Sequence, residues 1–200
     1  MVEAFAPRSA LAGLATPVEP HGDPGVHVCE LANLGLVSVL VRNGRRADLA
    51  TRMAGHGLDL PDGPHAAIGD QLMLLGTGPR AWLAMKAGAS PAWAEQLRQE
   101  LEGVAAVADQ SSAYVALRLE GPAVRGLLAK GVMVDLHPRV FAVGAVAVVS
   151  IAHTSAILWR SSENSFDLLV TRSYAADLWR WLDHSAAEFG LVFTGQGKDG

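Results

Sequence analysis

A chain of 200 residues is long enough to bury one core, or two half-domains that share one, and half of its residues are hydrophobic while 18% are charged. Its 16 basic and 20 acidic residues give a formal charge of −4, so no net positive field is present to attract a polyanion, and nucleic acid is excluded as an expected partner. The single cysteine, Cys29, excludes an internal disulfide and a thiol-rich metal cage.

The amino-terminal segment, residues 1–29, is predicted to form an extended arm. Four of the chain's ten prolines fall within it, and it lacks sustained periodicity. The same prolines interrupt any apolar segment behind a basic stretch, so we expect no secretory signal. The longest uncharged apolar stretch, 140–151, is too short to cross a bilayer as a helix and predicts a strand. These observations favour a cytoplasmic protein without a membrane contact.

The first half-domain is predicted to span residues 30–105. A strand at 37–43 leads into a helix after Gly44, in which Leu49 and Met53 lie one turn apart on the face that packs on a sheet. The helix is followed by an Asp-Leu-Pro stop. This half therefore begins with a strand and an amphipathic helix.

The rest of that half is predicted to contain one more strand and two more helices. A strand at 72–77 is expected to open a helix containing Trp82 and Met85. A further helix begins at Ser90, which is a favourable N-cap followed by proline, and ends at Gly103.

Residues 106–192 are predicted to form a second half-domain that repeats the first. The strand at 115–121 leads to a helix carrying Leu127 and Leu128, and an Asp-Leu-His-Pro stop follows at 135–138. Two copies of so long a unit indicate a duplicated half-domain rather than a repeat array.

The second half continues with three predicted strands and a helix. Strands at 145–151, 156–159 and 166–171 precede a final helix, which is expected to be capped by Ser173 and to bury its apolar side chains, namely Leu178, Trp181, Leu182 and Phe189. Residues 193–200 are expected to form a disordered tail. The predicted fold class is α+β, with two pseudo-repeated βαβ-like halves.

The final helix supplies the candidate interface residues. Trp179 and Trp181 lie two positions apart, so one is expected to face the core and the other to lie near the surface or under a partner. Tryptophan and arginine are enriched at protein contacts. Arg172, Trp179 and Arg180 are therefore the predicted interface patch, with packing of the tryptophan along its own helix as the alternative.

Residues with catalytic potential occur without the pattern that catalysis needs. Asp109, Ser111 and Ser112 precede a strand, and His153 is a base type, but no Gly-x-Ser-x-Gly turn is present. Asp and Ser at a strand entrance commonly bond to their own backbone, which favours a structural role. The sequence therefore predicts no catalytic residue.

Two further patterns resemble ligand sites incompletely. His27, Cys29 and Glu30 are zinc-binding types, but strand alternation puts the first two on one face and Glu30 on the other. The segment at 76–79 is glycine-rich and is expected to end a strand and open a helix, but it lacks the P-loop lysine. We therefore expect a packed thiol and a capping turn, with no metal or cofactor bound by this chain.

Three segments carry a family resemblance, namely 7–11 (Pro-Arg-Ser-Ala-Leu), 109–112 (Asp-Gln-Ser-Ser) and, above all, 166–179 with its Arg-Ser junction and Leu-Trp pair. From about residue 5 to residue 192 the chain resembles the gamma subunits of heterotetrameric sarcosine oxidase. These belong to the aminomethyltransferase-like group, together with the glycine-cleavage T protein and YgfZ.

The resemblance implies a non-catalytic structural subunit that docks on the flavoprotein through its arm and one sheet-helix face, and can shape the route of an imine or formaldehyde between sites. Its partners would be the alpha, beta and delta subunits. The complex would demethylate sarcosine oxidatively to glycine and hydrogen peroxide, with the one-carbon unit passed to tetrahydrofolate or released as formaldehyde. The resemblance places FAD, FMN and NAD in the two larger subunits and zinc in the smallest.

The chain departs from the folate-binding members of this group. Cys29 lies outside any Lys-Gly-Cys-Tyr-x-Gly-Gln motif of the YgfZ type, and no carboxylate aligns with the pterin-binding acid of the T protein. A stand-alone YgfZ-like folate-binding module, or a one-carbon transferase, is therefore the alternative function.

Overall fold

The computed structural model describes residues 9–16 and 23–197, and it confirms the α+β class. The elements in chain order are β1 (Val26–Leu31), β2 (Leu34–Val41), α1 (Arg46–Ala54), β3 (Ala66–Ile68), β4 (Met73–Gly78), β5 (Ala81–Ala87), α2 (Trp93–Glu100), β6 (Ala105–Asp109), β7 (Tyr114–Glu120), α3 (Val124–Ala129), β8 (Val146–Ile151), β9 (Thr154–Ser162), β10 (Ser165–Thr171), a 3-10 turn (Arg172–Tyr174), α4 (Ala175–Ser185) and β11 (Leu191–Gly197).

The strands form two sheets with matching strand orders. The five-stranded sheet has the order β3-β4-β5-β2-β6, and the six-stranded sheet has the order β8-β9-β10-β7-β1-β11. The two orders correspond strand by strand, with β8, β9, β10, β7 and β11 in the places of β3, β4, β5, β2 and β6. The one difference is that β1 is inserted between β7 and β11. All neighbouring strands are antiparallel except β1 and β11, which are parallel. The duplicated organisation is thus present in the sheets, which are antiparallel rather than built from parallel βαβ units.

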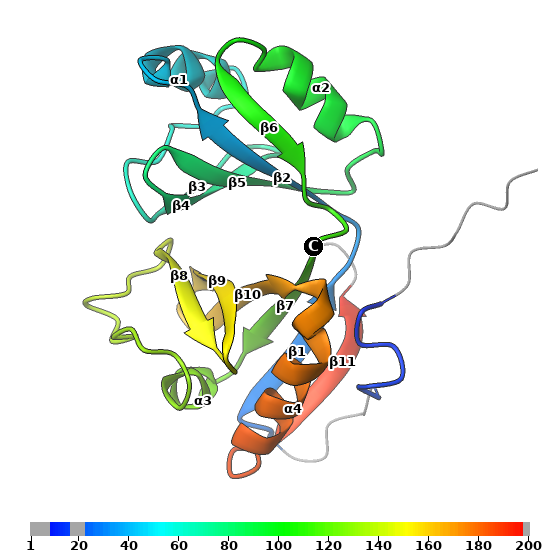
Figure 1. Cartoon of the computed structure of the whole chain (residues 1–200). Helices are drawn as coiled ribbons and strands as arrows, with labels where there is room; N and C mark the ends of the chain where they lie inside the picture. The colour runs from blue at the N-terminus through cyan, green and yellow to red at the C-terminus, as the bar shows by residue number, and fades with distance from the viewer. Residues whose placement is uncertain (1–8, 17–22, 198–200) are drawn as a thin grey trace, which may run out of the picture.

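Four layers follow from this arrangement. Helices α1 and α2 cover the outer face of the five-stranded sheet, α3 and α4 cover the outer face of the six-stranded sheet, and the inner faces of the sheets meet in the middle (Figure 1). Strand alternation explains this, because Val37 and Val39 of β2 point to the helices while Leu36 points to the other sheet. Leu36 meets Leu169 and Trp159 in an apolar cluster between the sheets.

The predicted helix containing Trp82 and Met85 is wrong. Both residues lie on β5, which forms a hairpin with β4 through a tight turn at Arg80. Arg80 has a φ of 60°, a left-handed conformation that suits a short hairpin turn. The run 81–87 alternates between two buried faces, so it gives no clean polar side from which the sequence could identify a strand.

The chain ends are more structured than predicted. Part of the predicted arm is β1, which pairs with both β11 and β7, and Leu11 is 1% exposed against the six-stranded sheet's core. At the other end, β11 continues to Gly197 within the predicted disordered tail. The rest of the predicted arm and tail, 1–8, 17–22 and 198–200, lies outside the described residues.

The helices keep their predicted buried faces but not their predicted caps. Leu49 and Met53 of α1 are buried, as are Leu178 and Leu182 of α4. Trp181 and Phe189 are only half-buried. The predicted caps Ser90 and Ser173 do not cap through their side chains. Ser90 instead accepts a bond from Trp93 through its backbone carbonyl, and Ser173 lies in the 3-10 turn before α4.

Candidate functional site

The three predicted interface residues lie near the junction of β10 and α4, in different environments. Arg172 is exposed, and its backbone N–H donates to the Ala113 carbonyl at 2.8 Å. Arg180 is exposed and forms an ion pair with Asp177 at 3.2 Å. Trp179 is half-buried, and its ring meets Phe193 of β11 edge-on at 5.1 Å between centroids. The arginines are therefore accessible, while the tryptophan mainly holds α4 against β11.

Both tryptophans of α4 contact the core, whereas only one was expected to do so. Trp181 packs on Gly131, where an added Cβ would lie 2.4 Å from the indole ring. A side chain larger than hydrogen at 131 would displace the ring. The glycine therefore allows α4 to sit close to the end of α3.

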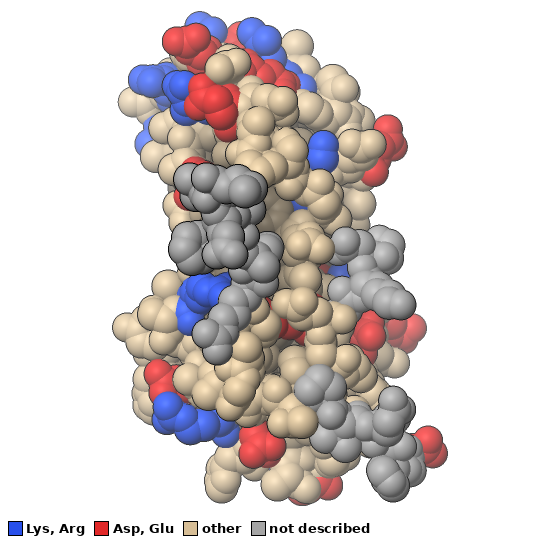
Figure 2. Space-filling view, turned by 90° about the vertical axis from the view of Figure 1, so that its right-hand side faces the viewer, with Lys and Arg blue, Asp and Glu red and all other residues tan. Residues whose placement is uncertain are grey.

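Arg172 lines a cleft with a volume of about 780 Å³. The cleft lies at the waist where the chain crosses between the sheets, and its other lining residues include Asn33, Ser111, Tyr114 and Gln196. Figure 2 views the molecule from the side and shows charged side chains of both signs in its upper and lower halves. The cleft lining also includes three charged residues, namely Glu30, Asp109 and Arg172.

The Asp109 segment has the structural role that its sequence predicts. The Asp109 carboxylate accepts bonds from the Ser111 hydroxyl at 2.6 Å and the Ser111 backbone N–H at 2.8 Å. These bonds lower the pKa of Asp109, with the hydroxyl bond as the larger cause. The Ser111 hydroxyl also accepts a bond from the Leu36 N–H. His153 lies elsewhere, in the turn between β8 and β9, with a φ of 64°.

The His27, Cys29 and Glu30 segment divides between two faces of β1, as alternation predicts. Glu30 is 5% exposed on the outer face, where its carboxylate accepts bonds from the Ser9 hydroxyl and the Ala10 N–H. Cys29 lies on the inner face, and burial raises the pKa of its thiol against the lowering effect of Arg118. The described residues contain no group of three His, Cys, Asp or Glu side chains placed to hold a metal ion.

The glycine-rich segment at 76–79 belongs to the β4–β5 hairpin and opens no helix. It therefore provides no helix N-terminus for a phosphate. Gly76 is required by packing, since an added Cβ would lie 2.0 Å from the Gly63 carbonyl oxygen. The segment thus fixes β4 against the chain that leads into β3.

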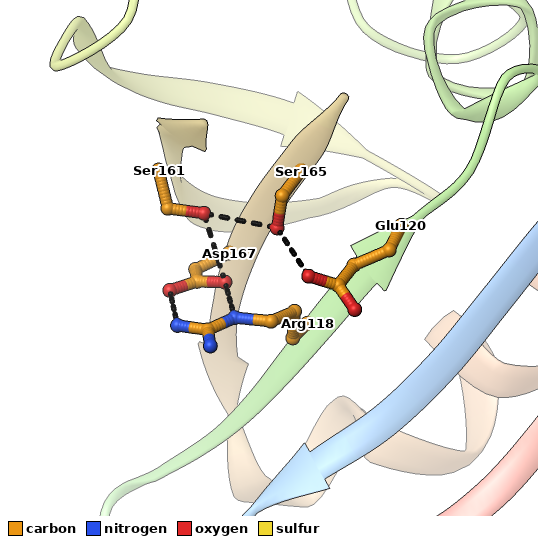
Figure 3. Close-up of polar contacts among 5 residues, drawn as sticks. All are labelled: Arg118, Glu120, Ser161, Ser165 and Asp167. Carbon is orange, nitrogen blue, oxygen red and sulfur yellow. Dashed lines mark hydrogen bonds and ion pairs between the residues drawn. The ribbon is translucent and has the colours of Figure 1, made fainter. Parts of the chain in front are cut away.

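A buried ion pair on the six-stranded sheet is the strongest polar feature that the sequence reasoning missed. Asp167 of β10 is 0% exposed and accepts two bonds from Arg118 of β7, from Nε at 2.8 Å and from Nη2 at 2.9 Å. The Ser161 hydroxyl lies within hydrogen-bond distance of both Ser165 and Asp167, to either of which it can donate its one hydrogen, and Ser165 donates to Glu120 (Figure 3). The pair raises the pKa of Arg118, so that its guanidinium stays charged. The sequence signal that could have revealed this pair is an aspartate inside the otherwise apolar run 166–170, because a buried carboxylate needs a partner.

This network has no catalytic geometry. Both oxygens of the Asp167 carboxylate accept bonds from Arg118, so the carboxylate is engaged as the partner of the guanidinium rather than as a general base toward a serine. The network instead fixes the register of β7, β9 and β10, since one side chain from each strand meets at Asp167.

The described part of the chain has no helix long and apolar enough to span a membrane.

Comparison with known proteins identifies the family. Residues 44–188 match the sarcosine oxidase, gamma subunit family. The chain belongs to the sarcosine oxidase gamma subunit family. It is 32% identical over 192 residues to the sarcosine oxidase subunit gamma of Corynebacterium sp. strain U-96, which covers 93% of this chain and 91% of the relative.

Solved structures agree with this membership. A chain of the heterotetrameric sarcosine oxidase from Corynebacterium sp. U-96, in complex with pyrrole 2-carboxylate, superposes with a TM-score of 0.80 at 29% identity, covering 96% of this chain and 99% of that one. The glycine cleavage system aminomethyltransferase T from Bartonella henselae shares the fold, with a TM-score of 0.63 at 14% identity over 86% of this chain and 48% of that one. The gamma chain therefore has the sequence and fold of a subunit of an oxidoreductase.

Proposed function

We propose that this chain is the non-catalytic structural gamma subunit of a heterotetrameric sarcosine oxidase, bound to alpha, beta and delta subunits in the cytoplasm. The assembly oxidises the N-methyl group of sarcosine, giving glycine and hydrogen peroxide, and the one-carbon unit passes to tetrahydrofolate or leaves as formaldehyde. FAD, FMN and NAD belong to the two larger subunits and zinc to the smallest. The gamma chain holds none of them and stabilises the assembly.

The observation that carries this proposal is the similarity to gamma subunits along nearly the whole chain. It covers 93% of the chain in sequence and 96% in structure, so the shared part includes both sheets and all four helices. The side-chain geometry supports a structural role. The reactive side chains are occupied, with Asp109 bonded to Ser111 and Asp167 to Arg118.

Co-expression tests the proposal. The affinity-tagged chain is produced together with candidate alpha, beta and delta subunits, and the purified material is separated by size-exclusion chromatography with absorbance recorded in the flavin bands. We expect one large, yellow peak that contains all four chains and oxidises sarcosine. Cells that express the same subunits with an untagged gamma chain are the control for non-specific retention.

A second sample separates this proposal from the folate-binding alternative. The tagged chain expressed alone is titrated with a reduced folate while its tryptophan fluorescence is followed. We expect no saturable quenching. A colourless, small protein that recruits no subunit and binds folate at micromolar concentration would contradict the structural assignment.

A further inference from the structure

The edge strand β8 and the loop before it expose an unusual amount of apolar surface. Nine large hydrophobic side chains are well exposed among the described residues, and five of them fall between 133 and 148. They are Met133 (93% exposed), Val134 (38%), Val140 (66%), Val143 (55%) and Val148 (53%). Clustered apolar exposure marks protein contact sites more often than isolated residues do.

The loop that carries four of these side chains is held firmly. Two of the loop's own side chains, Leu136 and Phe141, are buried, and the Phe141 ring stacks on Phe166 at 6.3 Å between centroids. Arg160, which is 3% exposed, donates from Nη1 to the Phe141 carbonyl at 2.8 Å. The Ala66 N–H of the other sheet donates to Gly144. A loop fixed in this way loses little conformational entropy when a partner binds.

Strand β8 also has free backbone groups at its outer edge. Arg160 donates to the Ala145 carbonyl, and antiparallel pairing alternates, so the N–H and C=O groups of Val148 and Ser150 point away from β9. Neither residue has another backbone partner in the described chain, whereas the N–H of Val146 donates to Pro64. The outer edge of β8 is thus hydrogen-bonded at Val146, and its outward backbone groups from residue 147 to residue 150 are unpaired in the described chain.

The other sheet edges carry features that discourage strand addition. β3 has three residues, β6 ends in the exposed Asp109, and β11 contains Gly195 at a φ of 85° beside a register shift in β1. β8 has six residues and no charge, proline or bulge. Figure 1 shows β8 and its loop on the side of the molecule opposite β11.

We propose that β8 and the loop 133–143 form the docking surface of this chain, and that an extended segment of another oxidase subunit adds to β8 as a seventh strand. This inference rests on the proposed function, because it takes the partner from the assembly. The free N–H and C=O groups of Val148 and Ser150 require an extended backbone, which identifies the segment's conformation. The exposed valines and Met133 require it to carry apolar side chains. These apolar side chains, which are exposed to water in the isolated chain, would then be covered by the partner in the complex.

Two substitutions on this surface and one control elsewhere test it in the co-expressed complex. Val148→Lys places a charge at the open edge, and Val140→Lys places one on the loop. Ala108→Lys is the matched control, because Ala108 is also exposed on an edge strand but belongs to β6 of the other sheet. We expect the first two to lower the yield of flavin-bearing complex about tenfold or more relative to wild type, and the control to stay within about twofold. Circular dichroism of each full chain verifies folding.

Hydrogen exchange distinguishes strand addition from side-chain contact. The peptide covering β8 is expected to exchange more slowly in the wild-type complex than in the free chain. Three results would overturn the inference: assembly of both variants at the control's level, unchanged exchange of β8, or a dimer of the free chain that Val148→Lys dissociates. Failure of the wild-type chain to recruit any subunit would instead remove the proposed function, and the inference with it.

Discussion

The two sheets share a strand order and a helix-covered outer face, but their inner faces differ. The central strands β2 and β5 of the five-stranded sheet present apolar side chains, namely Leu36, Leu83 and Met85. The corresponding strands of the six-stranded sheet, β7 and β10, contribute Ala116 and Leu169 to the apolar cluster between the sheets and also carry the ion pair of Arg118 and Asp167. The faces that pack on helices are thus similar in kind in both copies, while the inner faces have diverged into an apolar and a partly ionic surface.

The two inner faces contribute differently, since the apolar face adds mainly to stability and the ion pair adds mainly to the choice of one strand register. An apolar inner face contributes free energy by removing surface from water, whereas a buried ion pair repays its desolvation only when its geometry is good. The Arg118 and Asp167 pair has two direct bonds and a serine, so it is well satisfied and defines one register for three strands. The five-stranded sheet instead contributes apolar side chains to the cluster between the sheets.

Removal of one charge should produce the largest effect. Asp167→Ala leaves Arg118 without its carboxylate in a site where Asp167 is fully buried, and we expect a loss of about 4 kcal/mol in the free energy of unfolding. Urea unfolding of the tagged chain measures it. Asp177→Ala is the control, since its pair with Arg180 is exposed and contributes about 0.5 kcal/mol or less.

The double variant Arg118→Leu/Asp167→Leu sharpens the same comparison. It makes this part of the six-stranded sheet apolar, like the five-stranded sheet, and should recover most of the stability lost in the single variant. If Asp167→Ala costs no more than Asp177→Ala, the buried pair has no energetic role in the difference between the sheets.

The second test concerns the contact between the inner faces. Leu169 is 0% exposed between the sheets, whereas Leu40 lies on the inner face of β2 with 50% of its surface exposed. Leu169→Ala should cost about 3 kcal/mol and Leu40→Ala about 1 kcal/mol or less, because only the first leaves a cavity. Thermal unfolding of the two variants checks this ratio. Equal losses would show that the sheets do not form a common core.

The sequence predicted the parts of the fold that have one buried face. Leu49 and Met53 in α1, and Leu178 and Leu182 in α4, were correctly assigned because helical spacing separates them from polar neighbours. β5 was assigned as a helix because it is buried on both faces, which removes the period-of-two pattern. The alternation of His27, Cys29 and Glu30 did predict a strand, which is β1, but not where that strand lies in the sheet. Its place between β7 and β11 depends on long-range pairing that no local pattern specifies.

The candidate site was predictable only where local bonding decides it. The role of Asp109 with Ser111 spans two residues and follows from the sequence. Arg118 and Asp167 lie 49 residues apart, so their pairing required the register of β7 and β10. The exposed edge of β8 could not be seen either, since an apolar run such as 140–151 predicts burial. Whether a partner uses Arg172, Trp179 and Arg180 as well remains a prediction.

The smallest expected effect is the pH dependence at the joint between the sheets. The bonds from Ser111 hold the pKa of Asp109 below its usual range, so the ionised carboxylate is more favoured in the folded chain than in the unfolded chain. This stabilisation is present above the unfolded pKa of about 3.9 and is lost as the pH falls through the lower folded value. Because Asp109 is exposed and solvent screens its charge, Asp109→Asn should be less stable than wild type by only about 0.5 kcal/mol or less at pH 7, and this difference should shrink toward pH 2. Urea midpoints at both pH values measure this, with Asp183→Asn as an exposed control; a constant difference would assign the effect to shape rather than charge.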